Sequence, residues 1–195
     1  MIARNKIILI AKLSLHCISN IACYRAGWDE TSNPKKLRNN IDFWTRANSN
    51  FLDVATLNWC ILFADQKGKH HWLKAFKTKD NLVNGLYQSI AMTESAFNDE
   101  LLKVKRYRDK YLAHLDNPAP APLFYPKTEF MLKSAKHIFE TLKSNEQTKP
   151  FLSGVYLNAD EHYAEKYEEA KKEILSSIRA NISYSRLKRL SPHPV

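Results

Sequence analysis

Glycine is scarce in this chain of 195 residues, which contains only four glycines. An average composition would supply roughly fourteen, because glycine makes up about 7% of ordinary sequences and concentrates in turns and phosphate-binding loops. Neither G-x-G-x-x-G nor G-x-x-x-x-G-K-[ST] can be assembled from Gly27, Gly68, Gly85 and Gly154. The deficit therefore favours helices over strands, and it excludes nucleotide binding by these two kinds of loop.

Cysteine is also rare. Cys17, Cys23 and Cys60 are an odd number and form no C-x-x-C pair, so the sequence indicates neither a disulfide framework nor a zinc ribbon. We expect buried free thiols in a reducing compartment, the cytosol. No metal ion and no cofactor is expected.

Long apolar runs are missing, since no stretch approaches the 18 consecutive apolar residues typical of a membrane-spanning helix. The N-terminus resembles a signal peptide, because Arg4 and Lys6 precede an apolar run. Lys12 ends that run after five residues, Ile7 to Ala11, which is shorter than the usual 7–15. Apolar residues then recur at helical intervals, so we favour an amphipathic core helix over a signal peptide and expect no association with a membrane.

Acidic residues are too few to balance the basic ones. The chain has 30 Lys and Arg against 20 Asp and Glu, a formal net charge of +10. Such an excess favours attraction to phosphate groups, which is salt-dependent, and makes RNA a candidate partner.

What is present is helical periodicity with no convincing strand pattern. We predict an all-α bundle of five or six helices with an antiparallel up-and-down core. Residues 1–180 form one domain, and residues 181–195 form a basic, flexible C-terminal tail. The expected helices cover about 5–25 (ending at a Gly27 cap), 33–62 with a possible break at 48–50, 82–90, 93–115, 130–142 and 160–178.

The segment 93–115 carries the most informative pattern. At 100° per residue, Phe97, Val104 and Leu112 fall on one apolar arc, and Arg108 lies in the middle of it. A guanidinium directed towards a core must be paired, or must line a polar pocket or an interface. Three prolines within 117–122 end this helix.

The phrase from Arg108 to Asp116 resembles the signature of the HEPN superfamily, an Arg followed by a polar residue and, after four to six positions, a His. Here these residues are Arg108, Asp109 and His114. The segments 24–28 (YRAGW), 59–65 (WCILFAD) and 70–72 (HHW) also resemble the branch of this superfamily that is linked to bacterial abortive infection. The resemblance covers roughly residues 20 to 120.

The resemblance implies a helical homodimer that cleaves RNA without a metal ion, in phage defence or a toxin–antitoxin response. Arg108 would hold phosphate oxygens, His114 would exchange the proton of the ribose 2′-OH, and cleavage would pass through a cyclic phosphate. Asp109 would orient Arg108 or His114, or form an ion pair with one of these two residues, across the dimer. An antitoxin protein is a possible partner. Asp116 stands where some members carry a modifiable Tyr two residues after the His, so control by modification there is not expected.

Geometry makes the second chain necessary. Six positions along an α-helix separate Arg108 and His114 by about 120° and about 9 Å, so one chain does not place both on one stripe. Two antiparallel copies can combine them into a composite site. We assign RNA binding to the neighbouring residues Lys105, Arg106, Lys110 and Tyr111.

Several alternatives stay open at this point. Arg108 can instead form a structural ion pair with a carboxylate such as Asp53 or Glu100, and His114 can interact only with its helix end. His70 and His71 fit loop packing better than metal binding. The alternative function is a non-catalytic HEPN-like module that binds RNA or a protein.

Overall fold

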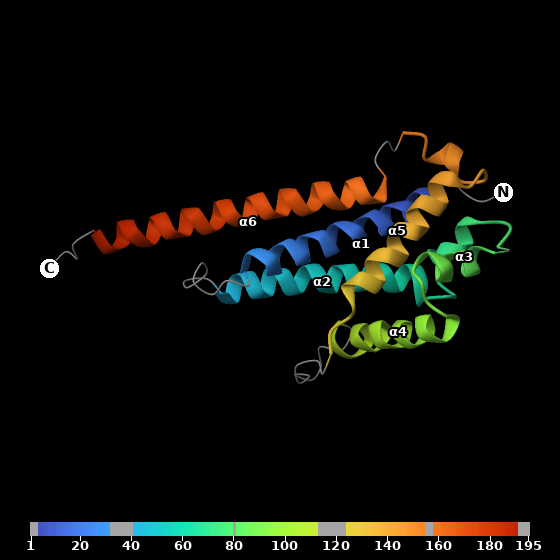
Figure 1. Cartoon of the computed structure of the whole chain (residues 1–195), viewed down its shortest axis with the longest axis horizontal. Coiled ribbons are helices and arrows are strands. Elements are labelled where there is room, and N and C mark those ends of the chain that lie inside the picture. The colour runs from blue at the N-terminus through green and yellow to red at the C-terminus, as the bar shows by residue number, and fades with distance from the viewer. Residues whose placement is uncertain (1–3, 32–40, 80, 113–123, 155–157, 191–195) are drawn as a thin grey trace.

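The computed structural model describes residues 4–31, 41–79, 81–112, 124–154 and 158–190 (Figure 1). Across these ranges the chain is all-α, with six α-helices and no strand, as predicted from the sequence. The α-helices are α1 (Arg4–Thr31), α2 (Ile41–Phe63), α3 (Leu82–Ser89), α4 (Glu94–Tyr107), α5 (Thr128–Ser144) and α6 (Ala159–Leu190). Short 3₁₀ turns lie at Trp72–Ala75 and Lys149–Phe151, and a π-helical turn lies at Arg108–Leu112.

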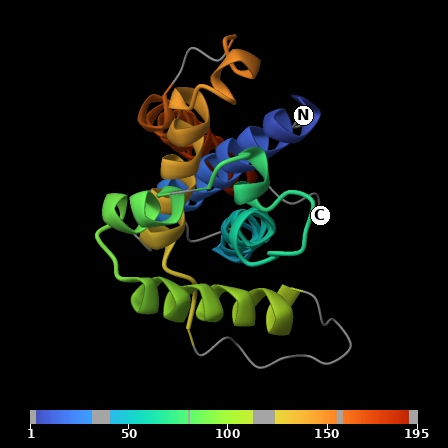
Figure 2. The same cartoon turned by 90° about the vertical axis from the view of Figure 1, so that its right-hand side faces the viewer.

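Helix α1 lies at the centre of the bundle and contacts α2, α5 and α6 (Figures 1 and 2). Its apolar residues Ile7, Ile10, Ile18 and Ile21 are fully buried, as the helical spacing of the N-terminal segment predicts. The stretch Arg4–Asp29 is nevertheless long and apolar enough to span a membrane, and 44% of its most apolar window is buried inside the protein. Length and composition do not distinguish these two roles, but packing against three helices is typical of a core helix.

The predicted end of α1 at a glycine cap is wrong. Gly27 does not adopt a left-handed conformation, and the helix continues through it to Thr31. Gly27 is buried because α1 passes close to Asn48 of α2, whose side-chain amide occupies the space that a Cβ atom on Gly27 would take. The glycine therefore permits a close helix crossing and does not stop a helix.

The possible break at 48–50 is absent, because α2 is continuous from Ile41 to Phe63. Asn48 is only 2% exposed and faces α1, so its polar side chain marks the crossing of two helices. The proposed helix start at Asn33–Pro34 lies outside the described residues.

An aromatic cluster fills the core between α2, α4 and α5. Trp59 is fully buried, stacks on Phe63 at a ring-centroid distance of 4.7 Å, and lies 5.2 Å from Phe130. Its indole Nε1–H donates to Ser134 Oγ at 2.8 Å, which satisfies the one polar group that its burial removes from water. This cluster holds the C-terminal half of α2 in place.

Helix α6 extends further than predicted. It runs to Leu190, so the helix covers most of the segment 181–195 that we assigned to a tail, and residues 191–195 lie outside the described residues. Figures 1 and 2 both place α4 on the side of the bundle opposite α6. The cysteines are free thiols; Cys17 and Cys60 are buried, as expected, but Cys23 is only half-buried.

The glycine crossing yields a stability test. We expect Gly27→Ala to lower the free energy of unfolding by about 1–3 kcal/mol, because the new methyl group overlaps the buried Asn48 amide. The matched control is Gly85→Ala in α3, where nothing lies within 4 Å of the added Cβ and where alanine stabilises a helix by up to about 1 kcal/mol. Urea unfolding measures both.

The same crossing predicts coupling between the two residues. In an Asn48→Ala background the penalty for Gly27→Ala should shrink, because the clashing amide is gone. Equal stabilisation by both glycine substitutions in the wild-type background would contradict this account.

Candidate functional site

Arg108 lies where α4 ends and the π-helical turn Arg108–Leu112 begins. Helix α4 starts at an N-cap, Thr93, whose hydroxyl accepts a hydrogen bond from the backbone N–H of Ala96, and its inward side buries Phe97 and Val104. A π-helical turn forms i→i+5 bonds in place of i→i+4 bonds, and such turns occur often at functional sites. The spacing calculated for an uninterrupted α-helix therefore does not apply beyond Arg108.

The Arg108 guanidinium forms two charged hydrogen bonds. Nη1 donates to Asp65 Oδ1 at 2.8 Å, and Nε donates to Asp109 Oδ1 at 2.8 Å. The Arg108 side chain is 17% exposed. Burial lowers the pKa of the guanidinium, and the hydrogen bonds to Asp65 and Asp109 raise that pKa by more, so it lies above its ordinary value. Arg108 therefore stays charged although it is largely buried.

This arrangement corrects two expectations. Asp109 pairs with Arg108 of its own chain, at its own helix end, where we expected no contact within the helix. Arg108 does form an ion pair, but its partners are Asp65 and Asp109, and neither Asp53 nor Glu100. Glu100 instead accepts hydrogen bonds from Lys103 at 2.9 Å and Lys127 at 2.8 Å.

Asp65 is the site residue that sequence reasoning missed. It follows the end of α2, where its backbone N–H and that of Ala64 both donate to the Cys60 carbonyl. The Gly68 N–H then donates to the Asp65 carbonyl at 2.7 Å, which closes the turn. Asp65 is the last residue of the segment 59–65 that resembles the HEPN branch, so two separate segments of that resemblance meet at Arg108.

A second polar contact docks α4 on α2. The Tyr107 hydroxyl donates to Asp53 Oδ1 at 2.8 Å, and Tyr107 is buried. Burial and the neighbouring carboxylate raise the pKa of Tyr107, while burial also raises the pKa of Asp53. Tyr107 thus binds a carboxylate within α2 and Arg108 binds one just past the end of α2, and these two contacts set the position of the π-helical turn.

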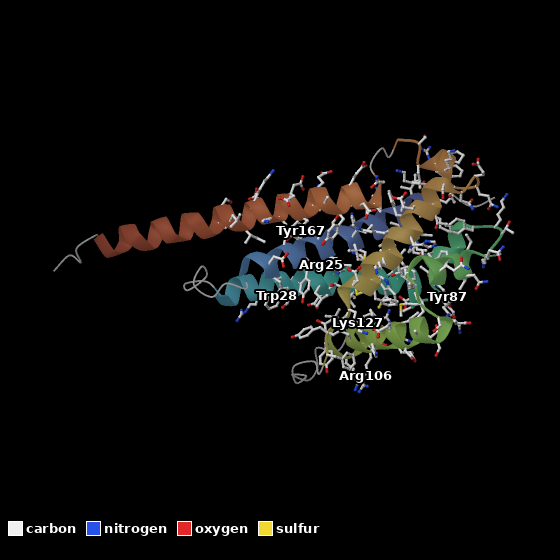
Figure 3. All side chains as sticks on the ribbon, viewed as in Figure 1. Arg25, Trp28, Tyr87, Arg106, Lys127 and Tyr167 are labelled. Carbon is white, nitrogen blue, oxygen red and sulfur yellow. The ribbon has the colours of Figure 1, made fainter. Side chains whose placement is uncertain are left out.

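The residues that we assigned to RNA binding surround this turn. Lys105, Arg106 and Lys110 are exposed, and within the described ranges none of the three forms an ion pair. Figure 3 shows Arg106 directed away from the bundle. Tyr111 is half-buried, with its ring 5.6 Å from that of Tyr107. The outer surface of α4 is therefore positively charged next to Arg108.

Two other side chains near Arg108 that could react, those of Cys60 and His71, are buried and poorly suited to catalysis. Burial raises the pKa of the Cys60 thiol to about 12, so the thiol is neutral at pH 7 and a poor nucleophile. His71 is buried and its pKa is lowered by that burial, which favours packing as its role. Within the described ranges no group of three or more His, Cys, Asp or Glu side chains has the geometry to hold a metal ion.

His114 lies outside the described residues, so its distance from Arg108 stays a prediction. What the described residues provide is a charged guanidinium with three of its five N–H donors not engaged by Asp65 or Asp109, next to an exposed basic surface. Such a group can bind phosphate oxygens. No family model, no curated protein and no solved structure matches this chain.

The Arg108–Asp65 pair yields a second prediction. A double-mutant cycle with Arg108→Ala and Asp65→Ala should give a coupling energy of roughly 1 kcal/mol, because the guanidinium is largely removed from water. The control is the more exposed pair Lys166–Glu169 on α6, for which we expect about 0.3 kcal/mol. Thermal or urea unfolding measures both cycles. A coupling no larger than that of the control would show that the Arg108–Asp65 pair does not help to hold α4 on α2.

Proposed function

We propose that this protein is a metal-independent endoribonuclease of the HEPN type, acting as a homodimer in the cytosol. The observation that carries the proposal is the largely buried, permanently charged Arg108 at the π-helical turn, beside the exposed Lys105, Arg106 and Lys110. A role in phage defence or in a toxin–antitoxin response, with an antitoxin protein as partner, is part of the same proposal and follows from the resemblance.

The chemistry needs a proton acceptor and a stabiliser of negative charge. His114 takes the proton of the ribose 2′-OH, since an imidazole with an ordinary pKa of about 6.5 exchanges protons near neutral pH. The oxygen attacks the adjacent phosphorus, the P–O bond to the 5′ oxygen of the next nucleotide breaks, and a 2′,3′-cyclic phosphate forms. The 5′ oxygen takes up a proton from solvent and leaves as a 5′-hydroxyl. Arg108 donates to the phosphate oxygens, whose negative charge grows in the transition state.

Asp65 and Asp109 act as positioning residues in this scheme. Each holds the guanidinium at 2.8 Å, so Arg108 keeps one orientation before the RNA arrives and less entropy is lost on binding. The same two carboxylates also weaken the attraction of Arg108 for phosphate, because their negative charge offsets its positive charge. Lys105, Arg106 and Lys110 supply the long-range attraction that this cluster of one cation and two carboxylates lacks.

An exposed apolar strip on α2 supports the dimer. Val54 and Leu57 are 43% and 41% exposed, lie three residues apart on one face, and follow Asp53, the residue that binds Tyr107. In our proposal a second copy packs on this strip, and the dimer pairs Arg108 of one chain with His114 of the other.

One observation favours the second candidate function, a non-catalytic HEPN-like module that binds RNA or a protein. Arg108 already pairs with two carboxylates, as a purely structural arginine does. In that case Arg108→Ala lowers stability, and RNA binding through the basic surface of α4 persists without any cleavage.

An RNA cleavage assay in EDTA tests the proposal. Arg108→Ala should slow cleavage by about 10²–10³-fold through loss of charge stabilisation, and His114→Ala by about 10²–10⁴-fold through loss of proton transfer. The matched control is Arg106→Ala, an exposed arginine on the same helix, which should raise KM and leave kcat nearly unchanged. A substrate with a 2′-deoxy sugar at the cleaved position should resist the wild-type protein.

Two results would contradict the mechanism. One is a cleavage rate of Arg108→Ala equal to that of the wild type, measured with folding verified by circular dichroism. The other is a wild-type protein that cleaves only when a divalent metal ion is supplied. Absence of cleavage together with salt-dependent RNA binding would establish the second candidate.

A further inference from the structure

Five aromatic rings form two neighbouring groups, and we call them together the aromatic track: Tyr111, Tyr107 and Tyr125 beside the π-helical turn, and Tyr24 and Trp28 on α1. The ring of Tyr107 lies 5.6 Å from Tyr111 and 6.0 Å from Tyr125, and the ring of Tyr24 lies 6.2 Å from Trp28. The two groups interact electrostatically, since Tyr125 contributes to the raised pKa of Tyr24, and Tyr24 contributes to that of Tyr107. The track therefore joins α4, the segment before α5, and α1.

Two rings of the track are open to solvent, although most aromatic side chains in a folded protein are buried. Tyr125 is 58% exposed and Trp28 is 47% exposed, whereas Trp59 and Trp72 are buried. Tyr125 is also held in place, because Lys127, two residues along, binds the buried Glu100 of α4 at 2.8 Å. Tyr125 is thus a fixed platform on an ordered segment, and Trp28 projects from α1.

The track ends in a hollow of about 380 Å³ between α1 and α6. Figure 3 shows Arg25 and Tyr167 on these two helices, with Trp28 near the end of α1. The Tyr167 hydroxyl bonds to Asp29, and Arg25 donates to Thr128 and Glu129. The lining residues are Tyr24, Arg25, Trp28, Asp29, Tyr163 and Tyr167.

We propose that the aromatic track binds single-stranded RNA, with bases stacked on Tyr125 and Trp28 and one nucleobase seated in the hollow between α1 and α6. The inference rests on the proposed function and deepens it, since the track leads away from Arg108 and gives the substrate strand a path across the protein. The segment 24–28 takes no part in the chemistry at Arg108. In this proposal its role is to supply half of the residues that line the hollow, Tyr24, Arg25 and Trp28.

The mixture of groups in the hollow fits a nucleobase. Four aromatic rings offer faces for stacking, which every base accepts. Arg25 supplies N–H donors and Asp29 a carboxylate acceptor, which suit the polar edge of a base. The phosphates of the same strand meet Arg106 and Lys110 at the other end of the track, where these side chains are exposed.

Binding of a strand that cannot be cleaved tests the track separately from catalysis. The probe is a fluorescent oligouridine of about twelve nucleotides with 2′-O-methyl sugars, which lack the attacking hydroxyl. By anisotropy, Trp28→Ala and Tyr125→Ala should each weaken binding at least about fivefold, as loss of one stacked base predicts. Trp28→Phe should restore most of the affinity, because it keeps a ring.

The control is Tyr87→Ala. Tyr87 is half-buried, lies 5.4 Å from Phe97 and lines a separate hollow beside α3, so its loss should leave binding unchanged. Wild-type binding should quench tryptophan emission, and Trp28→Phe should remove most of that quenching. The same probe annealed into a duplex should bind at least about fivefold more weakly, because its base faces are covered.

Failure of the track and failure of the ribonuclease are distinguishable. Unchanged probe binding by Trp28→Ala and Tyr125→Ala overturns the track, even if Arg108→Ala abolishes cleavage. Weakened binding in these two variants supports the track, even if the wild-type protein cleaves nothing. A wild-type protein that does not bind the probe, or binds duplex equally well, overturns the track and leaves the aromatic surface to a protein partner.

Discussion

The burial of α1 is the constraint on which the rest of the structure depends. A helix of 28 residues with fully buried isoleucines must be covered on several sides, and α2, α5 and α6 cover it. The crossing of α1 and α2 is close because Gly27 has no side chain, and Asn48 fills the space. This crossing sets where α2 lies, and α2 carries Asp53 and, just past its end, Asp65.

The candidate site follows from that placement of α2. Helix α4 binds it through Tyr107 at Asp53 and through Arg108 at Asp65, and the π-helical turn begins at the second of these contacts. A guanidinium that is 17% exposed keeps its charge because two carboxylates hold it. Substitutions that shift α2 should therefore also shift the candidate site, even where the substituted residue does not contact RNA in our proposal.

Much of the fold could be predicted from the sequence, because helical spacing and the lack of glycine both indicate an all-α bundle. The positions that we interpreted as helix ends or helix breaks were predicted less well. Gly27 is a crossing point and not a cap, and Asn48 lies inside a continuous helix, because tertiary packing overrides the local preference of a single residue.

The site was predicted in part. Helical projection directed Arg108 inward, but the projection carries no information on partners from other elements. Asp65, distant in sequence and placed by the turn after α2, was therefore missed. The aromatic track was missed for the same reason, since Tyr24, Tyr107 and Tyr125 belong to three separate segments. His114 lies outside the described residues, and its role rests on the HEPN resemblance.

The central claim is a composite site that takes its arginine from one chain and its histidine from the other. Mixing the inactive variants Arg108→Ala and His114→Ala, with subunit exchange verified, measures this most directly. Random pairing gives half heterodimers, each with one intact site, so the account predicts recovery of about a quarter of wild-type RNA cleavage. A mixture as inactive as either variant alone would contradict it.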